Sequence, residues 1–348
     1  MRSRFDCLSP TLVWIVLAWN MFAAIAMNTS AKGFGPARHF VPASSTEFGL
    51  QEEIQTKFRL LSWNVLAPSW DNLGTKQSNW HSRWARILQE VRVRKPDVMV
   101  LQEVEVLIYD DQIQPFFKAR GYLSVYTGVD SGVGVAVFWR SSKFELKSAT
   151  DFELSTTKLT PWRSLLDGSF NKQQRERYAT KSNMVLFVIL TCVGQEEVRP
   201  HAIMIGAVHL TANPAHHKPL LMDVQLFETN VLLDGMQEII KQERLKYSSL
   251  NCILAGDFNV PHFFPESVFK SMTRHIENPA GSWEEPSSDE ESLPSPVYEL
   301  LTRGNLTAES IGFLMTAIKA SGFHPSILLQ GGLLRLAADW LSRQFCSA

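Results

Sequence analysis

The stretch KPDVMVLQEVE, residues 95–105, sets the pattern from which the fold can be read. Pro96 ends a helical segment, because proline cannot continue a helix. The run Asp97–Gln102 is apolar between its two end residues, has the length of a buried strand, and leads directly into the carboxylate of Glu103. A polar side chain at this point is held on rigid backbone at the edge of a sheet.

Three other apolar segments carry polar residues at their ends in the same way. They are FRLLSWN (residues 58–64) with Asn64, IMIGAVHL (203–210) with His209, and ILAGDFN (253–259) with Asp257 and Asn259. Each of these residues alone is more often a solvated or turn residue than a catalytic one. Because the set recurs at strand ends, we expect it to converge on one pocket.

Helical segments separate the strands. In Asn79–Lys95, apolar residues recur at i, i+3, i+4 and i+7, which predicts an amphipathic helix with a basic outer face. Further helices are expected around Tyr109–Arg120 and Pro219–Lys241, and further strands at Gly132–Trp139, Met184–Thr191, Ala202–Leu210 and Asn251–Ala255. Since strands outnumber helices, stacked sheets with helices outside are predicted.

Composition narrows the class of protein. The chain has 348 residues, of which 45% are hydrophobic, so it is neither disordered nor fibrous. Lys and Arg number 34 against 35 Asp and Glu, a balance that excludes bulk attraction to nucleic acid or anionic membrane. Four scattered cysteines exclude a disulfide scaffold and a zinc ribbon. The length allows two domains, but no internal repeat is present and one layered domain is favoured.

The N-terminal residues resemble a targeting segment. Thr11–Met27 is apolar except for Thr11 and Asn20, and it follows Arg2 and Arg4. Three interpretations stay open: a cleaved secretory or organellar signal, an uncleaved anchor that contacts a membrane, and a buried helix. We therefore divide the chain into a signal peptide or anchor (1–27), a linker (28–56), a folded domain (57–306) and an atypical helical tail (307–348). A secretory, endomembrane or organellar location is expected, with the cytoplasm as the alternative.

The strand-end residues suit a hard cation and a phosphoryl group. Mg²⁺ takes one or two carboxylates and shares its remaining positions with water and substrate phosphate. Zinc is disfavoured, because no cysteine lies among these residues and His209 alone cannot make a zinc site.

The motifs resemble those of the endonuclease/exonuclease/phosphatase superfamily. Within it they are similar to the branch of carbon-catabolite-repression-type deadenylases, nocturnin, the Angel proteins and the mitochondrial 2′-phosphodiesterase. The matching segments, in the family's order, are SWNVLAP (62–68), RWARILQEV with KPDVMVLQEVE (83–105), GVGVAVFWR (132–140), AVHLTANP with MDVQLFET (207–214 and 222–229), AGDFNVP (255–261) and SPVYELLTRGNL (295–306).

This resemblance implies a fold and a set of roles. The fold would be a four-layer α/β-sandwich, with two mixed β-sheets face to face and helices outside. Glu103 would be the principal Mg²⁺ ligand, with Mn²⁺ as the other candidate ion, and Asn64 would lie beside it in the metal site and orient the metal or a phosphate oxygen. Asp257 would align or deprotonate the attacking water, Asn259 would hold a phosphate oxygen, and His209 would stabilise charge on the phosphoryl group. Asn213 and Arg140 are expected to contact substrate, with Arg175, Arg177 and Lys181 adding local positive charge.

The C-terminal part departs from the family pattern. A strand with a Leu-Asp-Tyr-Ile-like aspartate and a terminal Ser-Asp-His are both missing from the sequence. In their place, Ile311–Ala320 and Ile327–Phe345 are apolar and helix-like. The sandwich is therefore expected to be incomplete at this end. The tail could pack on the sheet, bind a partner or membrane, or come from an alternative exon or shifted frame.

Three hypotheses for the function follow. The first is a Mg²⁺-dependent phosphodiester hydrolase of RNA, a 3′–5′ exonuclease of the deadenylase type with reduced activity, whose partner is poly(A) or an mRNA 3′ end. The second is a catalytically inactive family member that acts as a binding protein. The third is a phosphatase or phosphodiesterase for lipid or nucleotide substrates. No base-recognition motif or aromatic RNA platform is visible.

Overall fold

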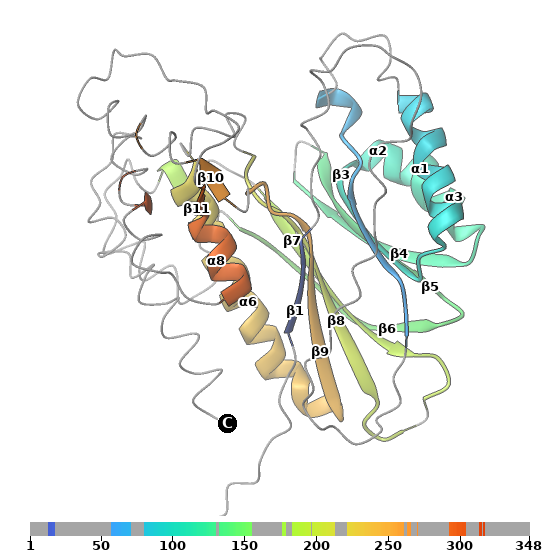
Figure 1. Cartoon of the computed structure of the whole chain (residues 1–348). Coiled ribbons are helices and arrows are strands. Elements are labelled where there is room, and N and C mark those ends of the chain that lie inside the picture. Colours follow the sequence, from blue (N-terminus) through green and yellow to red (C-terminus); the bar gives the residue numbers. More distant parts are fainter. Residues whose placement is uncertain are drawn as a thin grey trace, which may run out of the picture.

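The computed structural model arranges the chain in two β-sheets with helices on their outer sides (Figure 1). It describes residues 13–17, 57–70, 80–129, 132–154, 176–178, 183–195, 197–212, 221–260, 263–265, 270, 292–303, 313–314 and 316. All statements below concern these residues.

The first sheet has four strands in the order β2-β3-β5-β4. They are β2 (Leu60–Asn64), β3 (Val98–Glu105), β5 (Val133–Arg140) and β4 (Tyr122–Gly128). β2 and β3 run parallel, and the other two pairs are antiparallel, so the sheet is mixed.

The second sheet has five strands in the order β1-β9-β8-β7-β6. They are β1 (Val13–Leu17), β9 (Ser249–Asp257), β8 (His201–His209), β7 (Met184–Cys192) and β6 (Phe144–Glu153). β1, β9 and β8 are parallel and the remaining pairs are antiparallel, so this sheet is also mixed. A short antiparallel pair, β10 (Phe263–Pro265) and β11 (Ser292–Pro294), stands apart from both sheets.

The two sheets pack face to face on an apolar core. The four-stranded sheet contributes valines of β3 and β5 together with Trp139. The five-stranded sheet contributes leucines and valines of β7 and small or branched residues of β8 and β9. All of these side chains are buried. Alternate residues of β3 point to the opposite side of their sheet, because successive strand residues face opposite ways. Met99 and Leu101 accordingly join a second core beneath the helices of that sheet.

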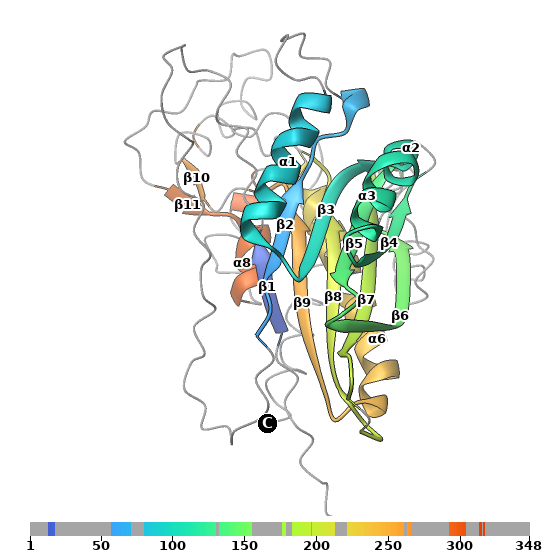
Figure 2. The ribbon, with the colours of Figure 1, turned by 90° about the vertical axis from the view of Figure 1, so that its right-hand side faces the viewer.

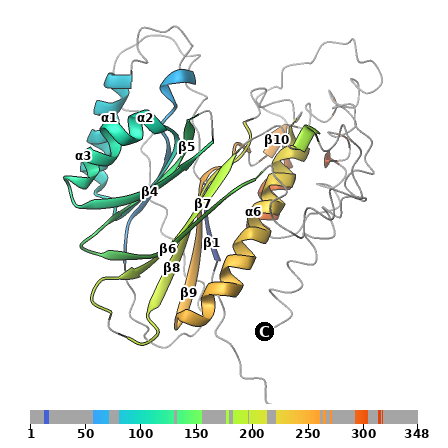
Figure 3. The ribbon, with the colours of Figure 1, turned by 180° about the vertical axis from the view of Figure 1, so that it is seen from behind.

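Helices cover both outer faces and complete four layers. α1 (Trp80–Arg94) and α3 (Gln114–Lys118) lie on the four-stranded sheet (Figure 2). α6 (Met222–Glu243) lies on the outer face of the five-stranded sheet (Figure 3), and α8 (Pro296–Arg303) packs with it in a third core. The expected four-layer α/β-sandwich is confirmed.

Short turns of helix connect the layers. α2 (Val106–Ile108) and a π-helical turn (Tyr109–Ile113) lead from β3 into α3, where a single helix over Tyr109–Arg120 was expected. Single 3₁₀ turns are present at Pro68–Trp70 and Arg244–Lys246.

Part of the segment expected to be a signal or anchor lies in a sheet. β1 pairs in parallel with β9, from Val13 opposite Cys252 to Leu17 opposite Gly256. The interpretation of Thr11–Met27 as a targeting segment stays a prediction, and most of that segment lies outside the described residues. Among the described residues, none of the helices has both the length and the apolar character that a membrane crossing needs. Of the tail, only Phe313, Leu314 and Thr316 are described, so its expected helices also stay predictions.

Candidate active site

The polar ends of four strands meet at one end of the sandwich. Asn64 is the last residue of β2, Glu103 lies near the end of β3, and His209 and Asp257 end β8 and β9. His209 stands opposite Asp257 in the parallel register of β8 and β9. The expected convergence of these four side chains on one place is therefore confirmed, with each sheet contributing two.

Asn64 joins the two carboxylates. Its amide nitrogen Nδ2 donates to Glu103 Oε1 at 2.6 Å and to Asp257 Oδ2 at 2.9 Å. Its oxygen Oδ1 accepts from the backbone N–H of Leu66 at 2.9 Å, which fixes the orientation of the amide. Asn64 therefore holds two acids from different sheets next to one another.

His209 completes a cluster of potential metal ligands. Its Nε2 lies 3.8 Å from Glu103 Oε1 and 3.7 Å from Asp257 Oδ2. This nitrogen is buried and makes no hydrogen bond to any described residue. One ligand atom from each of Glu103, His209 and Asp257 lies within 4.8 Å of the other two. The two adjacent carboxylates fit a divalent cation, because the ion would compensate the two like charges held together. The imidazole nitrogen is left either to join them as a ligand or, when it carries a proton, to face a bound substrate.

The backbone is strained at this end of the sandwich. Leu66, Glu103 and Asn259 have φ of 61°, 56° and 52°, in the left-handed region that costs a non-glycine residue about 1–2 kcal/mol. At Glu103 the pairing of β3 with β5 shifts register, so this residue sits at a bulge. A bulge redirects a side chain from the regular alternation of a strand. The Glu103 carboxylate also accepts from the backbone N–H of Ala67 at 3.1 Å, which stabilises it against the strain.

Asn259 braces the turn that follows β9. Its Nδ2 donates to the Leu210 carbonyl at 2.8 Å, and its backbone N–H donates to Asp257 Oδ1 at 3.0 Å. The side chain thus ties the end of β9 to the segment after β8. Its expected contact with a phosphate oxygen stays a prediction.

Helix α6 supplies buried polar residues that the sequence analysis did not identify. Gln225 Nε2 donates to the carbonyls of Thr211 at 2.9 Å and Asn259 at 2.8 Å. Glu228 accepts from the N–H and hydroxyl of Thr211, at 2.8 and 2.6 Å, and from Asn183 at 2.7 Å. These contacts hold in place the two segments that directly follow His209 and Asp257 in the sequence. The available signal was a glutamine and a glutamate three residues apart, on one face of the first two turns of this helix.

Arg177 is committed to a buried ion pair. Its Nε and Nη2 donate to the two oxygens of Asp223, each at 2.8 Å, and the Tyr178 hydroxyl donates to Oδ2 at 3.2 Å. Burial alone would lower the pKa of Arg177, but the hydrogen bonds and charge of Asp223 outweigh it and the pKa is raised. Burial and the Asp223 charge raise the pKa of Tyr178 far above its ordinary value. Arg177 therefore anchors its segment on α6 and does not supply the expected charge for a nucleic-acid backbone.

Arg140, which was expected to contact substrate, lies away from the cluster. Arg140 is at the far end of β5, with Nε 3.7 Å from Asp97 Oδ1 and its guanidinium 4.7 Å from the Tyr122 ring centroid. Arg140 is therefore not a member of the cluster formed by Glu103, His209 and Asp257. Asn213, Arg175 and Lys181 lie outside the described residues.

The chain matches one protein-family model and is similar to several known proteins. Residues 61–308 match the family model described as "Endonuclease/Exonuclease/phosphatase family". "Protein angel homolog 1" of Rattus norvegicus is 26% identical over 314 residues, covering 84% of this chain and 42% of its own length. "CCR4-Not complex 3'-5'-exoribonuclease subunit Ccr4" of Candida glabrata is 24% identical over 263 residues, covering 68% of this chain and 28% of its own length.

The chain spans less than half the length of these curated relatives. Among solved structures, a crystal structure titled "ANGEL2, a 2',3'-cyclic phosphatase" is 23% identical with a TM-score of 0.49, covering 76% of this chain and 60% of the other.

Proposed function

Because the chain belongs to the Endonuclease/Exonuclease/phosphatase family, we propose that it hydrolyses phosphodiester bonds in RNA with the aid of a divalent cation. The observation that carries this proposal is the cluster of Glu103, His209 and Asp257, with Asn64 hydrogen-bonded to both acids. Phosphoryl transfer depends mainly on positioning and on compensation of charge, and this cluster offers both.

The cation would be held by Glu103 and Asp257. Mg²⁺ is the proposed ion because both residues offer hard carboxylate oxygens, and Mn²⁺ suits the same donors. When bound, such an ion polarises a phosphoryl oxygen and neutralises developing negative charge.

The side chains of the chain itself have separable roles. Asn64 holds the two carboxylates close together, so that the site is organised before substrate arrives. Asp257 receives hydrogen bonds on both of its oxygens, from Asn64 and from the Asn259 N–H, which fixes its carboxylate for orienting the attacking water. His209 Nε2 makes no hydrogen bond to a described residue and is positioned to donate to a phosphoryl oxygen as charge develops there.

RNA is proposed as the substrate class through the relatives. Several are named as a 3′–5′-exoribonuclease subunit, which supports removal of nucleotides from a 3′ end, with poly(A) or an mRNA 3′ end as the substrate. The chain's balance of charge is compatible with this, because a hydrolase can hold its substrate through a cation and a few phosphate contacts.

The test is a product analysis of the purified full chain with Mg²⁺. A 5′-labelled oligoadenylate, a DNA oligonucleotide of the same length, a phosphoinositide and a small cyclic nucleotide are incubated side by side. Stepwise shortening of the RNA from its 3′ end is expected, with no product from the other three. Preferential hydrolysis of the lipid or small nucleotide would reassign the substrate. No turnover of any substrate by a folded chain that binds the ion would indicate a binding protein.

A further inference from the structure

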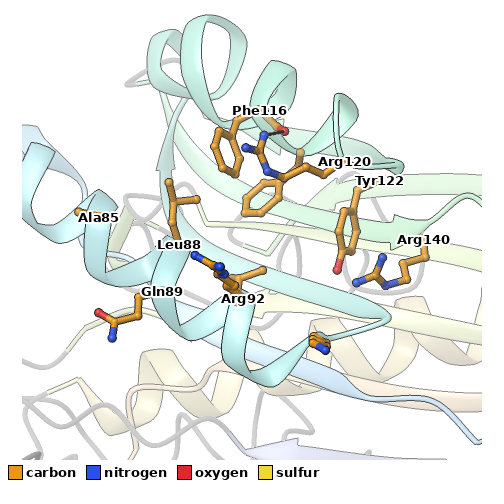
Figure 4. Close-up of a pocket in the computed structure, with 11 residues that line it drawn as sticks. Ala85, Leu88, Gln89, Arg92, Phe116, Arg120, Tyr122 and Arg140 are labelled. Atoms are coloured by element: carbon orange, nitrogen blue, oxygen red, sulfur yellow. Dashed lines mark hydrogen bonds between the residues drawn. The ribbon is translucent and has the colours of Figure 1, made fainter.

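A pocket of about 730 Å³ lies on the outer side of the four-stranded sheet (Figure 4). It is formed where the C-terminal half of α1 and the end of α3 approach the start of β4 and the end of β5. Its volume is typical of sites that bind small molecules or parts of larger ligands.

The pocket carries positive charge that nearby acids compensate only in part. Its lining includes four cations, Arg92, Lys95, Arg120 and Arg140, and no carboxylate. Arg92 and Lys95 are exposed and ion-pair with no acid in the part of the chain that the structure describes. The nearby Asp97 is buried and is shared between Arg140 and Lys143, at 3.7 and 2.9 Å. An anion would therefore meet several donors and no repelling acid in the lining.

Aromatic rings hold two of these cations in place. The Arg120 guanidinium lies 3.5 Å from the Phe116 ring centroid and donates to the Phe116 carbonyl at 3.0 Å. The Arg140 guanidinium lies 4.7 Å from the centroid of Tyr122, whose hydroxyl donates to the Pro96 carbonyl at 2.6 Å. Guanidinium groups stacked in this way lose little freedom on binding a phosphate, and they keep their N–H edges available.

Compensation of helix dipoles accounts for only part of this charge. Cations are favoured near the C-termini of helices, where Arg92 and Arg120 stand. Arg140 belongs to a strand, and a dipole gives no reason for acids to be missing from the whole lining.

The pocket is remote from the catalytic cluster. Arg140 donates its backbone N–H to the Asp97 carbonyl, just before β3 begins, whereas Glu103 lies near the end of β3. The five residue-to-residue steps of strand from Val98 to Glu103 span about 17 Å. One phosphate cannot reach both places, but a single-stranded chain of several nucleotides can.

We propose that this pocket, defined by Arg92, Lys95, Arg120 and Arg140, binds backbone phosphates of single-stranded RNA at a distance from the nucleotide being cleaved. The proposal rests on the RNA substrate proposed above. It assigns to the pocket the part of the RNA that lies outside the catalytic cluster. The chain has a net charge of −1, so these cations stand out as a local site for a polyanion.

The experiment measures binding in EDTA, where no cleavage takes place. The double variant Arg92→Gln/Arg120→Gln is compared with Arg86→Gln/Lys118→Gln. The second pair removes the same charge from exposed positions on α1 and α3 that do not line the pocket. Fluorescence anisotropy with labelled oligoadenylate is recorded between about 50 and 200 mM KCl, since the slope of log affinity against log salt falls by about 0.7 for each lost phosphate contact. Circular dichroism checks that both variants are folded.

The pocket variant is expected to bind long oligoadenylate about tenfold more weakly at low salt and to lose about 1.4 from the salt slope, while the control pair matches the wild type. Cleavage of a trinucleotide with Mg²⁺ should be unchanged in both. Equal losses of RNA binding in the two variants, or no loss in either, would overturn the proposal. Binding of anionic vesicles and of inorganic phosphate is measured on the same proteins. If the pocket variant lost either of these and kept its binding to RNA, the proposal would also be overturned. A chain that shows the salt effect yet cleaves nothing would contradict the proposed hydrolysis and leave this site standing.

Discussion

The side-chain amide of Asn64, at the end of β2, donates a hydrogen bond of 2.9 Å to Asp257 Oδ2, at the end of β9. The two residues are 193 positions apart and belong to different sheets. Since the same amide nitrogen also donates to Glu103, one side chain sets the spacing of the two acids. The geometry of the cluster therefore depends on how the two sheets pack against each other. Substitutions that disturb this packing should lower the catalytic rate.

Replacing Asn64 by alanine should loosen this link. The variant leaves Glu103 Oε1 and Asp257 Oδ2 without that donor, and we expect a loss of about 1–3 kcal/mol in the free energy of unfolding. Urea unfolding measures the loss. Asn251→Ala, at an exposed position of β9, is the control and should change little. Equal stability of the Asn64 variant and the wild type would show that the amide does not join the sheets.

Metal binding should stabilise the fold through Glu103. At a concentration about 100 times the dissociation constant, a ligand specific for the native state adds about 2.7 kcal/mol. A thermal shift with Mn²⁺ or Mg²⁺ is expected for the wild type and not for Glu103→Gln. Glu105→Gln, on the same strand but hydrogen-bonded to the Ser69 N–H, should keep the shift. An unchanged shift in Glu103→Gln would place the ion elsewhere.

Gln225 is expected to act as a positioning residue. Gln225→Leu removes its donors to the Thr211 and Asn259 carbonyls, so kcat on oligoadenylate should fall by about one to two orders of magnitude with little change in KM. Thr229→Val removes a buried hydroxyl that bonds only within α6, and it should lower stability without lowering kcat. Steady-state kinetics at a temperature where both variants are folded separate the two effects. A parallel fall in kcat for both would reduce Gln225 to a structural role.

Cys252 should resist alkylation in the native protein. Burial raises the pKa of its thiol to about 12, so roughly one part in ten thousand is thiolate at pH 8. Cys192 is only partly buried and should be labelled first. Iodoacetamide treatment followed by peptide mass spectrometry is expected to modify Cys192 in buffer and both cysteines in urea. Equal labelling of the two in buffer would mean that β9 opens readily.

The central strands were predictable because they are buried on both sides. The runs of β3, β8 and β9 are largely apolar, and the polar residues at their ends predicted Glu103, His209 and Asp257 as site residues. Asn64 was predicted in the same way from β2, although β2 is a half-buried edge strand. β4 and β6 were not identified. Both are edge strands with several exposed polar residues, so neither carries the apolar run of a central strand.

The hydrogen-bond partners of the residues around the site could not be predicted from the sequence. Arg177 was expected near a nucleic acid because nothing local reveals its partner Asp223, which lies 46 residues away. Gln225 and Glu228 were missed for the same reason, since their partners lie 14 to 45 positions away in the sequence. Gln225 donates to two backbone carbonyls, and Glu228 accepts from a backbone N–H and from the side chains of Thr211 and Asn183. Residue type and strand position thus predicted which groups carry the chemistry, whereas the hydrogen bonds that hold them depend on tertiary packing.

The most direct test of the central claim is the single-turnover rate of oligoadenylate cleavage as a function of Mg²⁺ concentration, for the wild type and Glu103→Gln prepared in parallel. We expect the wild-type rate to rise with Mg²⁺ to a plateau and to vanish in EDTA, and the rate of the variant to be lower by about two to three orders of magnitude, because a carboxylate beside the reacting phosphate is lost. Cleavage by Glu103→Gln at the wild-type rate, or a wild-type rate independent of the ion, would contradict the assignment of this cluster as the active site.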